Sequence, residues 1–365
     1  MLDLVSAFAR YNAFRELGYP RCLPFTMTFV TTIKCNSRCM TCDIGNIYMA
    51  NPRLADGELT LSEYEKIFDS MGKVYWVTIG GGEPFLRQDF ADIVISLVQR
   101  GGPRLVNLST NGSLTKRTVE GIGRIAAKLG DAQLIVNMSL DGIGKDHDTV
   151  RGLPHNFDNL LATVKGIREL RAPGVAIGIN TVISKFNIDK VSGIIDYVVD
   201  DLRPDSFTVE AAQIRPEFYN ETSRPEATPE AIATIIDKYL RRTRETPAMG
   251  LARVKGAFRQ LYYKDVKDMV HGRHAHRCFS AFTSCQVTPK GDVWSNAQLA
   301  DKLGNLRDEG LDFGRLWFSP EADRVRQKIK SAPCKCELSN VMYPNMFMDP
   351  LRVAQVAWRV VRGNT

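Results

Sequence analysis

The sequence predicts an α/β fold, a partial (β/α)6 TIM-like barrel followed by a small α+β module that is rich in cysteine. Three observations lead to this class. Short β-rich runs alternate with segments of helical periodicity between residues 24 and 215, polar residues follow the ends of these runs, and four of the eight cysteines lie beyond residue 277. Strands and helices that alternate with short turns form a parallel sheet with the helices outside it.

The composition is that of an ordinary globular protein, with 44% hydrophobic and 24% charged residues. No apolar run is long enough to span a bilayer, and residues 1–20 lack the pattern of a secretory signal. We therefore expect a cytoplasmic protein whose cysteines are ligands or core thiols. The net charge of +7 is modest for 365 residues, and we expect no nucleic-acid partner.

The chain begins with an amphipathic segment, residues 1–23, in which apolar side chains recur at near-helical spacing over residues 2–17. A β-rich run follows at residues 25–33. Residues 60–72 then show helical periodicity, with Thr60 as the expected N-cap and Glu63 three residues later. These two segments form the first strand and helix of the predicted barrel.

Three cysteines, Cys35, Cys39 and Cys42, follow the first strand within a single loop. Active sites of barrels lie at the carboxyl ends of their strands. Three thiolates from one loop suit an iron–sulfur cluster of four irons, in which one iron is left open to another molecule. A zinc loop or a set of buried thiols is the alternative.

Polar residues also follow the next strands of the predicted barrel. Residues 74–79 form the second strand, and a glycine-rich turn follows it. The remaining strands are expected at residues 105–109, 134–140, 175–183 and 206–211. The candidate residues after these strands are Gly81, Gly82, Glu83, Pro84, Ser109, Asn111, Ser139, Asp141 and Arg151.

The C-x3-C-x2-C loop and the Gly-Gly-Glu-Pro element at residues 81–84 resemble those of radical S-adenosylmethionine (radical SAM) enzymes. The resemblance implies an open six-stranded barrel, a [4Fe-4S] cluster on the three cysteines, and SAM on the open iron. It implies that residues 81–84 line the methionyl amino group of SAM. Ser139 and Arg151 are candidates for the SAM carboxylate or ribose, and Arg151 suits bidentate carboxylate binding. Thr41 departs from the pattern, because relatives commonly have an aromatic residue before the third cysteine.

The chemistry implied by this resemblance is reductive cleavage of SAM to methionine and a 5′-deoxyadenosyl radical, which removes a hydrogen atom from a substrate. An external one-electron donor such as flavodoxin or ferredoxin is then required. The protein would be an oxidoreductase or catalyse a related radical transformation, such as an oxidation, an epimerisation or a bond-forming step.

Substrate candidates follow the sixth strand, where Glu210, Gln213 and Arg215 face the expected opening of the barrel, although a solvated loop is an alternative interpretation. Residues 216–277 form a helical linker with several basic residues that could hold phosphate groups of a substrate, although a basic exposed face is the simpler interpretation. The basic helices favour a sugar-like, lipid-linked or other natural-product metabolite as the substrate. A ribosomally made peptide is the close alternative. A third alternative is a scaffold or electron carrier that holds clusters without cleaving SAM.

A second group of cysteines, Cys278, Cys285, Cys334 and Cys336, surrounds a predicted hairpin at residues 284–296. Residues 278–350 resemble the Twitch or SPASM module of radical SAM enzymes, which implies an auxiliary iron–sulfur cluster. Two features depart from that pattern. No cysteine follows the second hairpin strand, and one residue rather than two separates the closing pair.

We predict that Cys285 replaces the missing ligand. If Thr288 faces Val293 across the hairpin turn, Cys285 lies opposite Asn296, where the missing cysteine is expected. A degenerate module whose thiols are buried without a cluster is the alternative.

The C-terminal residues 351–365 form an amphipathic helix with arginines on one face. Such a helix packs on the barrel or lies on a membrane, and packing is the simpler expectation. A peripheral membrane contact would suit a lipid-carried substrate.

Overall fold

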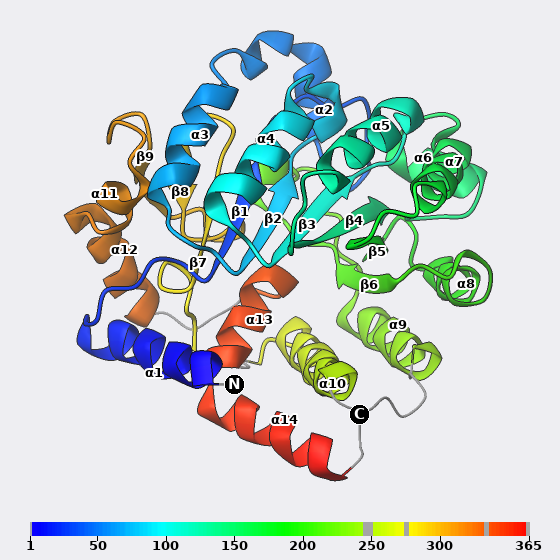
Figure 1. The fold of residues 1–365 in the computed structure, drawn as a ribbon. Helices are drawn as coiled ribbons and strands as arrows, with labels where there is room; N and C mark the ends of the chain where they lie inside the picture. Colours follow the sequence, from blue (N-terminus) through cyan, green and yellow to red (C-terminus); the bar gives the residue numbers. More distant parts are fainter. Residues whose placement is uncertain (1, 244–250, 274–276, 332–335, 363–365) are drawn as a thin grey trace.

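The computed structural model describes residues 2–243, 251–273, 277–331 and 336–362. One mixed sheet organises the chain (Figure 1), and its strands follow the order β6-β5-β4-β3-β2-β1-β7-β8-β9. The first six strands pair in parallel with their neighbours in sequence, as the strand–helix alternation predicts. Their bounds are β1 Thr26–Val30, β2 Trp76–Gly80, β3 Leu105–Thr110, β4 Gln133–Ser139, β5 Val175–Ile183 and β6 Ser206–Ala211.

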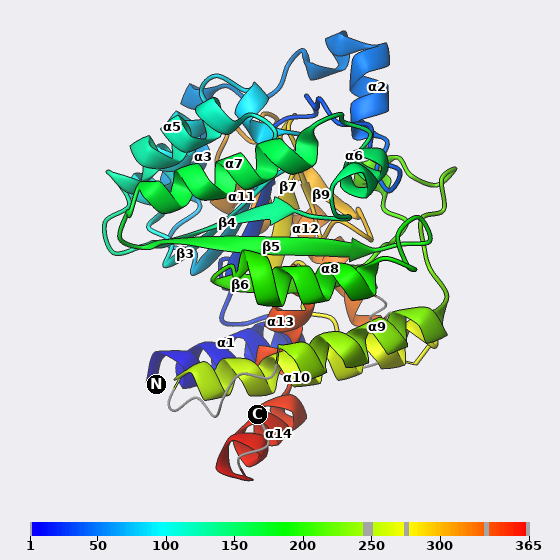
Figure 2. The same cartoon turned by 90° about the vertical axis from the view of Figure 1, so that its right-hand side faces the viewer.

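Helices cover the outer face of this sheet (Figures 1 and 2). They bury alternate strand residues, such as Val77 and Ile79 of β2, in a continuous apolar core. The capping box predicted for Thr60 and Glu63 is present at the start of α3. The helices of the barrel half are α2 Ile44–Ala50, α3 Leu61–Ser70, α4 Phe90–Ser96, α5 Thr115–Ala126, α6 Lys145–Arg151, α7 Asn156–Glu169 and α8 Val191–Tyr197.

The inner face of the sheet is polar. Asn137 of β4 donates a hydrogen bond from Nδ2 to Oδ1 of Asn107 on β3, at 2.5 Å. Gly178 of β5 makes room for this pair, because a Cβ atom there would lie 1.8 Å from Asn137 Oδ1. Side chains that can form hydrogen bonds therefore line the concave side, which in a barrel faces the site.

The predicted hairpin is part of the same sheet rather than of a separate one. Strand β7 (Ser284–Val287) pairs in parallel with β1, and β8 (Asp292–Trp294) and β9 (Lys302–Asn305) continue the sheet antiparallel. The sequence did not predict the pairing of β7 with β1. The C-terminal region thus extends the barrel sheet beyond β1.

The predicted register of the hairpin is wrong by one residue. Val287, not Thr288, pairs with Val293, so that Cys285 falls opposite Ser295 rather than Asn296. The turn is longer than expected, because Thr288 N–H donates to Asp292 O at 2.9 Å and closes a five-residue loop. Gly291 in this loop has a φ of 86°, a conformation that glycine adopts without strain.

The remaining helices lie below the sheet in Figures 1 and 2 or flank its β9 edge. Helix α1 confirms the predicted N-terminal helix with the same bounds. None of the described helices is long and apolar enough to cross a membrane. These helices are α1 Leu2–Leu17, α9 Pro229–Arg242, α10 Leu251–Val270, α11 Phe313–Trp317, α12 Pro320–Ser331, α13 Ser339–Met348 and α14 Pro350–Arg362.

Helix α13 crosses the inner face of the sheet. Asn340 donates from Nδ2 to Oγ1 of Thr28 on β1 at 3.0 Å. The adjacent Ser339 donates from Oγ to Oε1 of Glu210 on β6 at 2.7 Å. One turn of helix therefore reaches from the first strand to the sixth and covers the open side of the partial barrel.

Candidate functional site

The cysteine loop leaves the carboxyl end of β1. Cys35 and Cys39 are buried, and Cys42 is partly exposed. Burial raises the pKa of the Cys35 thiol to about 12, and the nearby Cys39 also raises it. The pKa values of Cys39 and Cys42 are raised as well, mainly by burial, and Cys39 and Cys35 add to the rise at Cys42. The three thiols therefore lie close to one another in a water-poor site, where bound metal would hold them as thiolates.

The described residues include no group of three or more His, Cys, Asp or Glu side chains that is placed to hold one metal ion. A four-iron cluster binds each thiolate through a different iron, so its ligands stand further apart than those of a single zinc ion.

The glycine-rich turn after β2 packs directly on the cysteine loop. Gly82 N–H donates to Thr32 O at 2.8 Å, and Glu83 N–H donates to Lys34 O at 2.7 Å. A Cβ atom on Gly82 would lie 2.5 Å from Lys34 O and 2.9 Å from Cys35 Cβ. A Cβ on Gly81, which has a φ of 153°, would lie 2.5 Å from Thr32 O. Both positions require glycine because the two loops touch through their backbones.

Glu83 is completely buried at the junction of β2 and β3. Its carboxylate accepts hydrogen bonds from Thr110 Oγ1 at 2.8 Å, Asn111 N–H at 2.7 Å and Phe85 N–H at 3.1 Å. Burial raises the pKa of Glu83, while the Asn111 and Thr110 donors oppose that rise. The carboxylate therefore ties the glycine-rich turn to the end of β3.

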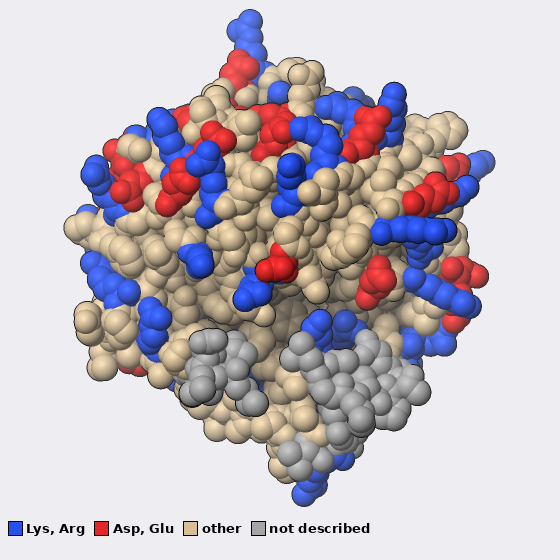
Figure 3. Space-filling model, viewed as in Figure 1, with Lys and Arg blue, Asp and Glu red and all other residues tan. Residues whose placement is uncertain are grey.

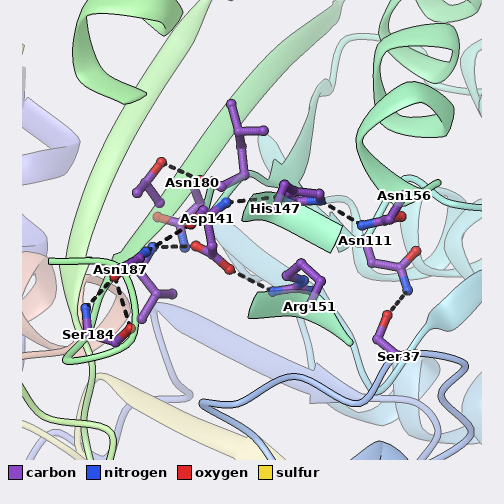
Figure 4. A network of polar contacts seen from close by, with 12 residues as sticks. Ser37, Asn111, Asp141, His147, Arg151, Asn156, Asn180, Ser184 and Asn187 are labelled. Carbon is purple, nitrogen blue, oxygen red and sulfur yellow. Dashed lines mark hydrogen bonds and ion pairs between the residues drawn. The ribbon is translucent and has the colours of Figure 1, made fainter. Parts of the chain in front are cut away.

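Asn111 carries this connection on to the cysteine loop (Figure 4). Its Nδ2 donates to Asn36 Oδ1 and to Ser37 Oγ, both at 2.9 Å. Sequence reasoning missed Asn36 and Ser37, because they carry no motif beyond lying between the cysteines. Ser109, by contrast, is exposed on the inner face beside Gly80 and has no side-chain hydrogen bond within the described structure.

Asp141, after β4, forms a second polar network (Figure 4). Its Oδ1 accepts from Val182 N–H at 2.8 Å, and its Oδ2 accepts from Arg151 Nη1 at 3.0 Å. Its own N–H donates to His147 Nδ1 at 3.2 Å. Burial, and then Arg151, lowers the pKa of His147 to about 4, so this imidazole is neutral near pH 7. The network orients Arg151 from one side.

Arg151 lies beside the cysteines with unused donors. Its side chain is 13% exposed, and its Nε is buried without a hydrogen-bond partner among the residues that the structure describes. Burial lowers the pKa of Arg151, but Cys39 and Asp141 raise it by more, so the side chain stays charged. Backbone bonds from Arg38 N–H to Arg151 O and from Met40 N–H to Val150 O hold the cysteine loop to the end of α6. A fixed cation with free N–H groups is suited to hold a carboxylate.

The substrate candidates contact the C-terminal segment. Asn180 on β5 pairs with Ser139 across the sheet and donates to Glu210 Oε2 at 3.4 Å, and Gln213 donates to Glu337 Oε2 at 3.1 Å. Three buried atoms around them have no hydrogen-bond partner in the described part of the chain: Asn180 Oδ1, Gln213 Oε1 and Arg215 Nε. The other end of the Arg215 guanidinium pairs with Glu217 at 3.0 Å.

Asn220 links these candidates to the cysteine loop, and the sequence offered no signal for it. The side chain is fully buried, and Nδ2 donates to Thr41 O and to Gln213 O, both at 2.9 Å. Its Oδ1 accepts from Arg215 N–H at 2.9 Å. The side-chain amide of Asn220 therefore holds the end of the cysteine loop against the segment after β6.

Cys285 and Cys336 have different surroundings. Cys285 pairs with Met27 of β1 and points with it to the outer, apolar face, where Arg326 is the charge that acts on its pKa. Burial raises the pKa of Cys336, a backbone hydrogen bond with Leu338 opposes that rise, and the nearby charges that act on it are Cys278, Arg215 and Glu337. Cys334 falls outside the described residues. The prediction that Cys285 is a ligand depended on a hairpin register that the structure does not have.

The comparison with known sequences covers the barrel and, in one case, most of the chain. Residues 29–198 match the Radical SAM superfamily. The chain is 27% identical over 334 residues to the AdoMet-dependent heme synthase of Methanosarcina barkeri, covering 86% of this chain and 87% of that protein. It is 32% identical over 179 residues to the mycofactocin maturase MftC of Mycobacterium tuberculosis, covering 48% of this chain and 40% of that protein.

Solved structures show the same fold. The structure of anSMEcpe with bound AdoMet matches with a TM-score of 0.57 at 13% identity, over 93% of this chain and 99% of that chain. SuiB of Streptococcus suis, bound to S-adenosylmethionine, matches with a TM-score of 0.55 at 17% identity, over 83% of this chain and 68% of that chain. At these identities the likeness concerns the fold alone.

The contact between the two loops yields a prediction. Gly82→Ala is expected to displace the cysteine loop and to lower the iron bound after anaerobic reconstitution by at least about half, since overpacking of this kind costs roughly 1–3 kcal/mol. Gly193→Ala is the matched control, because a Cβ there meets nothing within 4 Å. Iron per chain and the melting temperature are the measurements. Full iron in the Gly82 variant would contradict the close packing described above.

Proposed function

Because the chain is a radical SAM enzyme, we propose that it binds a [4Fe-4S] cluster through Cys35, Cys39 and Cys42, cleaves SAM reductively, and abstracts a hydrogen atom from a small-molecule metabolite. The observation that carries this proposal is the meeting of three neighbouring thiols, two of them buried, with the glycine-rich turn and a charged arginine at the carboxyl end of one sheet. The family implies both the cluster and SAM. Bound together and reduced, they supply the 5′-deoxyadenosyl radical.

The residues around the cysteine loop have separate tasks in this proposal. Arg151 holds the carboxylate of SAM through its free N–H groups, and residues 81–84 line the methionyl end through their backbone. Ser109 and Ser139 offer hydroxyls on the inner face. Asn111 and Asp141 act by positioning, because their side chains are already engaged with the cysteine loop and with Arg151.

The share of the chain that each relative matches supports a small-molecule substrate. The relative named as a heme synthase matches both the barrel and the C-terminal region, whereas the maturase matches less than half of the chain. We propose that Glu210, Gln213 and Arg215 contact the substrate, which would complete the hydrogen bonds of the buried Gln213 Oε1 and Arg215 Nε. A sugar-like, lipid-linked or tetrapyrrole metabolite fits this polar lining.

The basic residues of the linker give weaker support for a phosphate-bearing substrate than the sequence suggested, because several of them are paired with acidic side chains. Lys238 pairs with Asp196 at 2.6 Å, and Arg242 pairs with both Asp196 and Asp200. Arg244 falls outside the described residues. These pairs leave fewer free cations on α9 for a phosphate group.

A peptide substrate is the second candidate, favoured by the 32% identity to the mycofactocin maturase over 179 residues. Substrate trials with deuterated compounds separate the two candidates, because the transfer of deuterium to 5′-deoxyadenosine identifies the molecule that loses hydrogen. A protein that holds clusters without cleaving SAM would form no 5′-deoxyadenosine with either class.

The catalytic proposal predicts SAM cleavage by the reconstituted protein. With iron, sulfide, dithionite and SAM under anaerobic conditions, the wild type is expected to form methionine and 5′-deoxyadenosine. Cys39→Ala removes a cluster ligand and is expected to abolish this product. Cys22→Ala, a buried cysteine outside both groups, is the control and should retain it. Product formation by the Cys39 variant at the wild-type rate would refute the assignment.

Arg151 yields a prediction that isolates SAM binding. Arg151→Gln is expected to weaken the binding of SAM about 10- to 100-fold while the cluster remains, since a hydrogen bond to a charged group contributes roughly 1.5–3 kcal/mol. The exposed Arg124, paired with Asp92, gives the control Arg124→Gln. Equilibrium binding of SAM and iron per chain are measured together. If the variant carried its full complement of iron and bound SAM as tightly as the wild type, Arg151 would not be part of the SAM site.

We also propose an auxiliary iron–sulfur cluster on Cys278, Cys334 and Cys336, for which the sequence named Cys285 as the fourth ligand. Cys336→Ala is expected to lower bound iron by roughly four atoms per chain. Because β7 turns Cys285 to the outer face, we expect Cys285→Ala to keep as much iron as Cys22→Ala. Loss of four irons from Cys285→Ala would show that Cys285 is a ligand, as the sequence predicted. Full iron in Cys336→Ala would contradict the proposed auxiliary cluster.

A further inference from the structure

Helix α14 docks on the protein through two of its three arginines and two valines. Arg352 forms an ion pair at 2.8 Å with Asp265 of α10, whose side chain is fully buried. One and two turns further along α14, Val356 is buried and Arg359 donates from Nη1 to Gln260 Oε1 at 2.9 Å. Val360 is partly buried against the core beside them. The larger apolar side chains of the helix do not lie on this inward side, although a surface helix usually turns them inward.

The apolar face of α14 is consequently exposed. Leu351 is 73% exposed, Trp358 is 53% exposed and Val353 is 39% exposed. Ala354 and Ala357, which lie between them on this side of the helix, are exposed as well. The helix carries three of the eleven large apolar side chains that are exposed in the described structure, so its outer face is an apolar patch rather than a single stray residue.

The position and charge of α14 fit an anionic surface. The helix projects at the lower end of the molecule, away from the sheet, in both views of the fold (Figures 1 and 2). Residues 350–362 contain three arginines and no acidic residue, and α10, which holds the helix, contains five basic and two acidic residues. In Figure 3 the lower tip shows basic side chains and no acidic ones.

We propose that α14 lies in the headgroup region of an anionic phospholipid membrane, with Leu351, Val353 and Trp358 inserted between the lipids. Arg362 is exposed and stacks over the Trp358 ring, 4.2 Å from its centroid, where it can reach lipid phosphates. Tryptophan and arginine are the side chains typical of this interface. A 13-residue helix with few apolar side chains supports reversible attachment rather than permanent anchoring.

The same chemistry disfavours a second copy of the chain as the partner. If two copies of the chain paired through their α14 faces, Arg362 of each copy would lie in the apolar interface between them. Helix α14 has no acidic residue that could neutralise this charge. Lipid phosphates supply the missing negative charge. The inference is independent of the SAM chemistry, since it rests on residues outside the barrel site.

Flotation of the reconstituted protein, residues 1–365, with vesicles tests the proposal. Vesicles of phosphatidylcholine and phosphatidylglycerol (3:1) are expected to carry the protein, and vesicles of phosphatidylcholine alone to carry about tenfold less. The double variant Leu351→Gln/Trp358→Gln should lose at least about tenfold in binding to the anionic vesicles, because each side chain contributes roughly 1–3 kcal/mol when buried. Binding should also fall in 0.5 M salt.

The control is Leu299→Gln, which removes an apolar side chain that is 46% exposed elsewhere on the surface and should leave flotation unchanged. Unaltered melting temperatures establish that the variants are folded. Failure of the wild type to float, or flotation of the double variant at the wild-type level, would overturn the proposal. A wild-type dimer that the double variant converts to a monomer would overturn it in favour of self-association.

Discussion

The backbone contact between the glycine-rich turn and the cysteine loop is the constraint on which the site depends. At Gly82 this contact leaves no room for a single carbon atom, so the distance between the two loops is set by main-chain atoms alone. The buried carboxylate of Glu83 then fixes the turn to the end of β3 through Thr110 and Asn111. The spacing between these two loops therefore does not change with side-chain rotamers, and hydrogen bonds from buried side chains fix the rest of the site around it.

The cysteine loop is held from three directions by other parts of the chain. Asn111 contacts it from β3, the last turn of α6 contacts it through backbone hydrogen bonds, and Asn220 contacts it from the segment after β6. Each contact also touches a group proposed to bind SAM or substrate. The three thiols, the Arg151 cation and the Gln213 segment therefore occupy fixed relative positions, and ordering them costs little when ligands bind.

The sequence predicted those features whose signals are local. The bounds of β5 and β6, the capping box of α3 and the turn at residues 81–84 each depend on neighbouring residues. The pairing of β7 with β1 joins segments more than 250 residues apart and leaves no local pattern. The hairpin register failed because one extra residue in the turn shifts every partner by one. Asn220 was missed because a single buried amide has no periodicity to reveal it.

The crossing of α13 over the inner face bears on the order in which the protein can be assembled. Residues 339 and 340, which join β6 to β1, are synthesised after every strand of the sheet. Until they dock, the concave face of the sheet is open on that side. Once they dock, a molecule reaches the concave face only along the strand ends or after release of this helical turn.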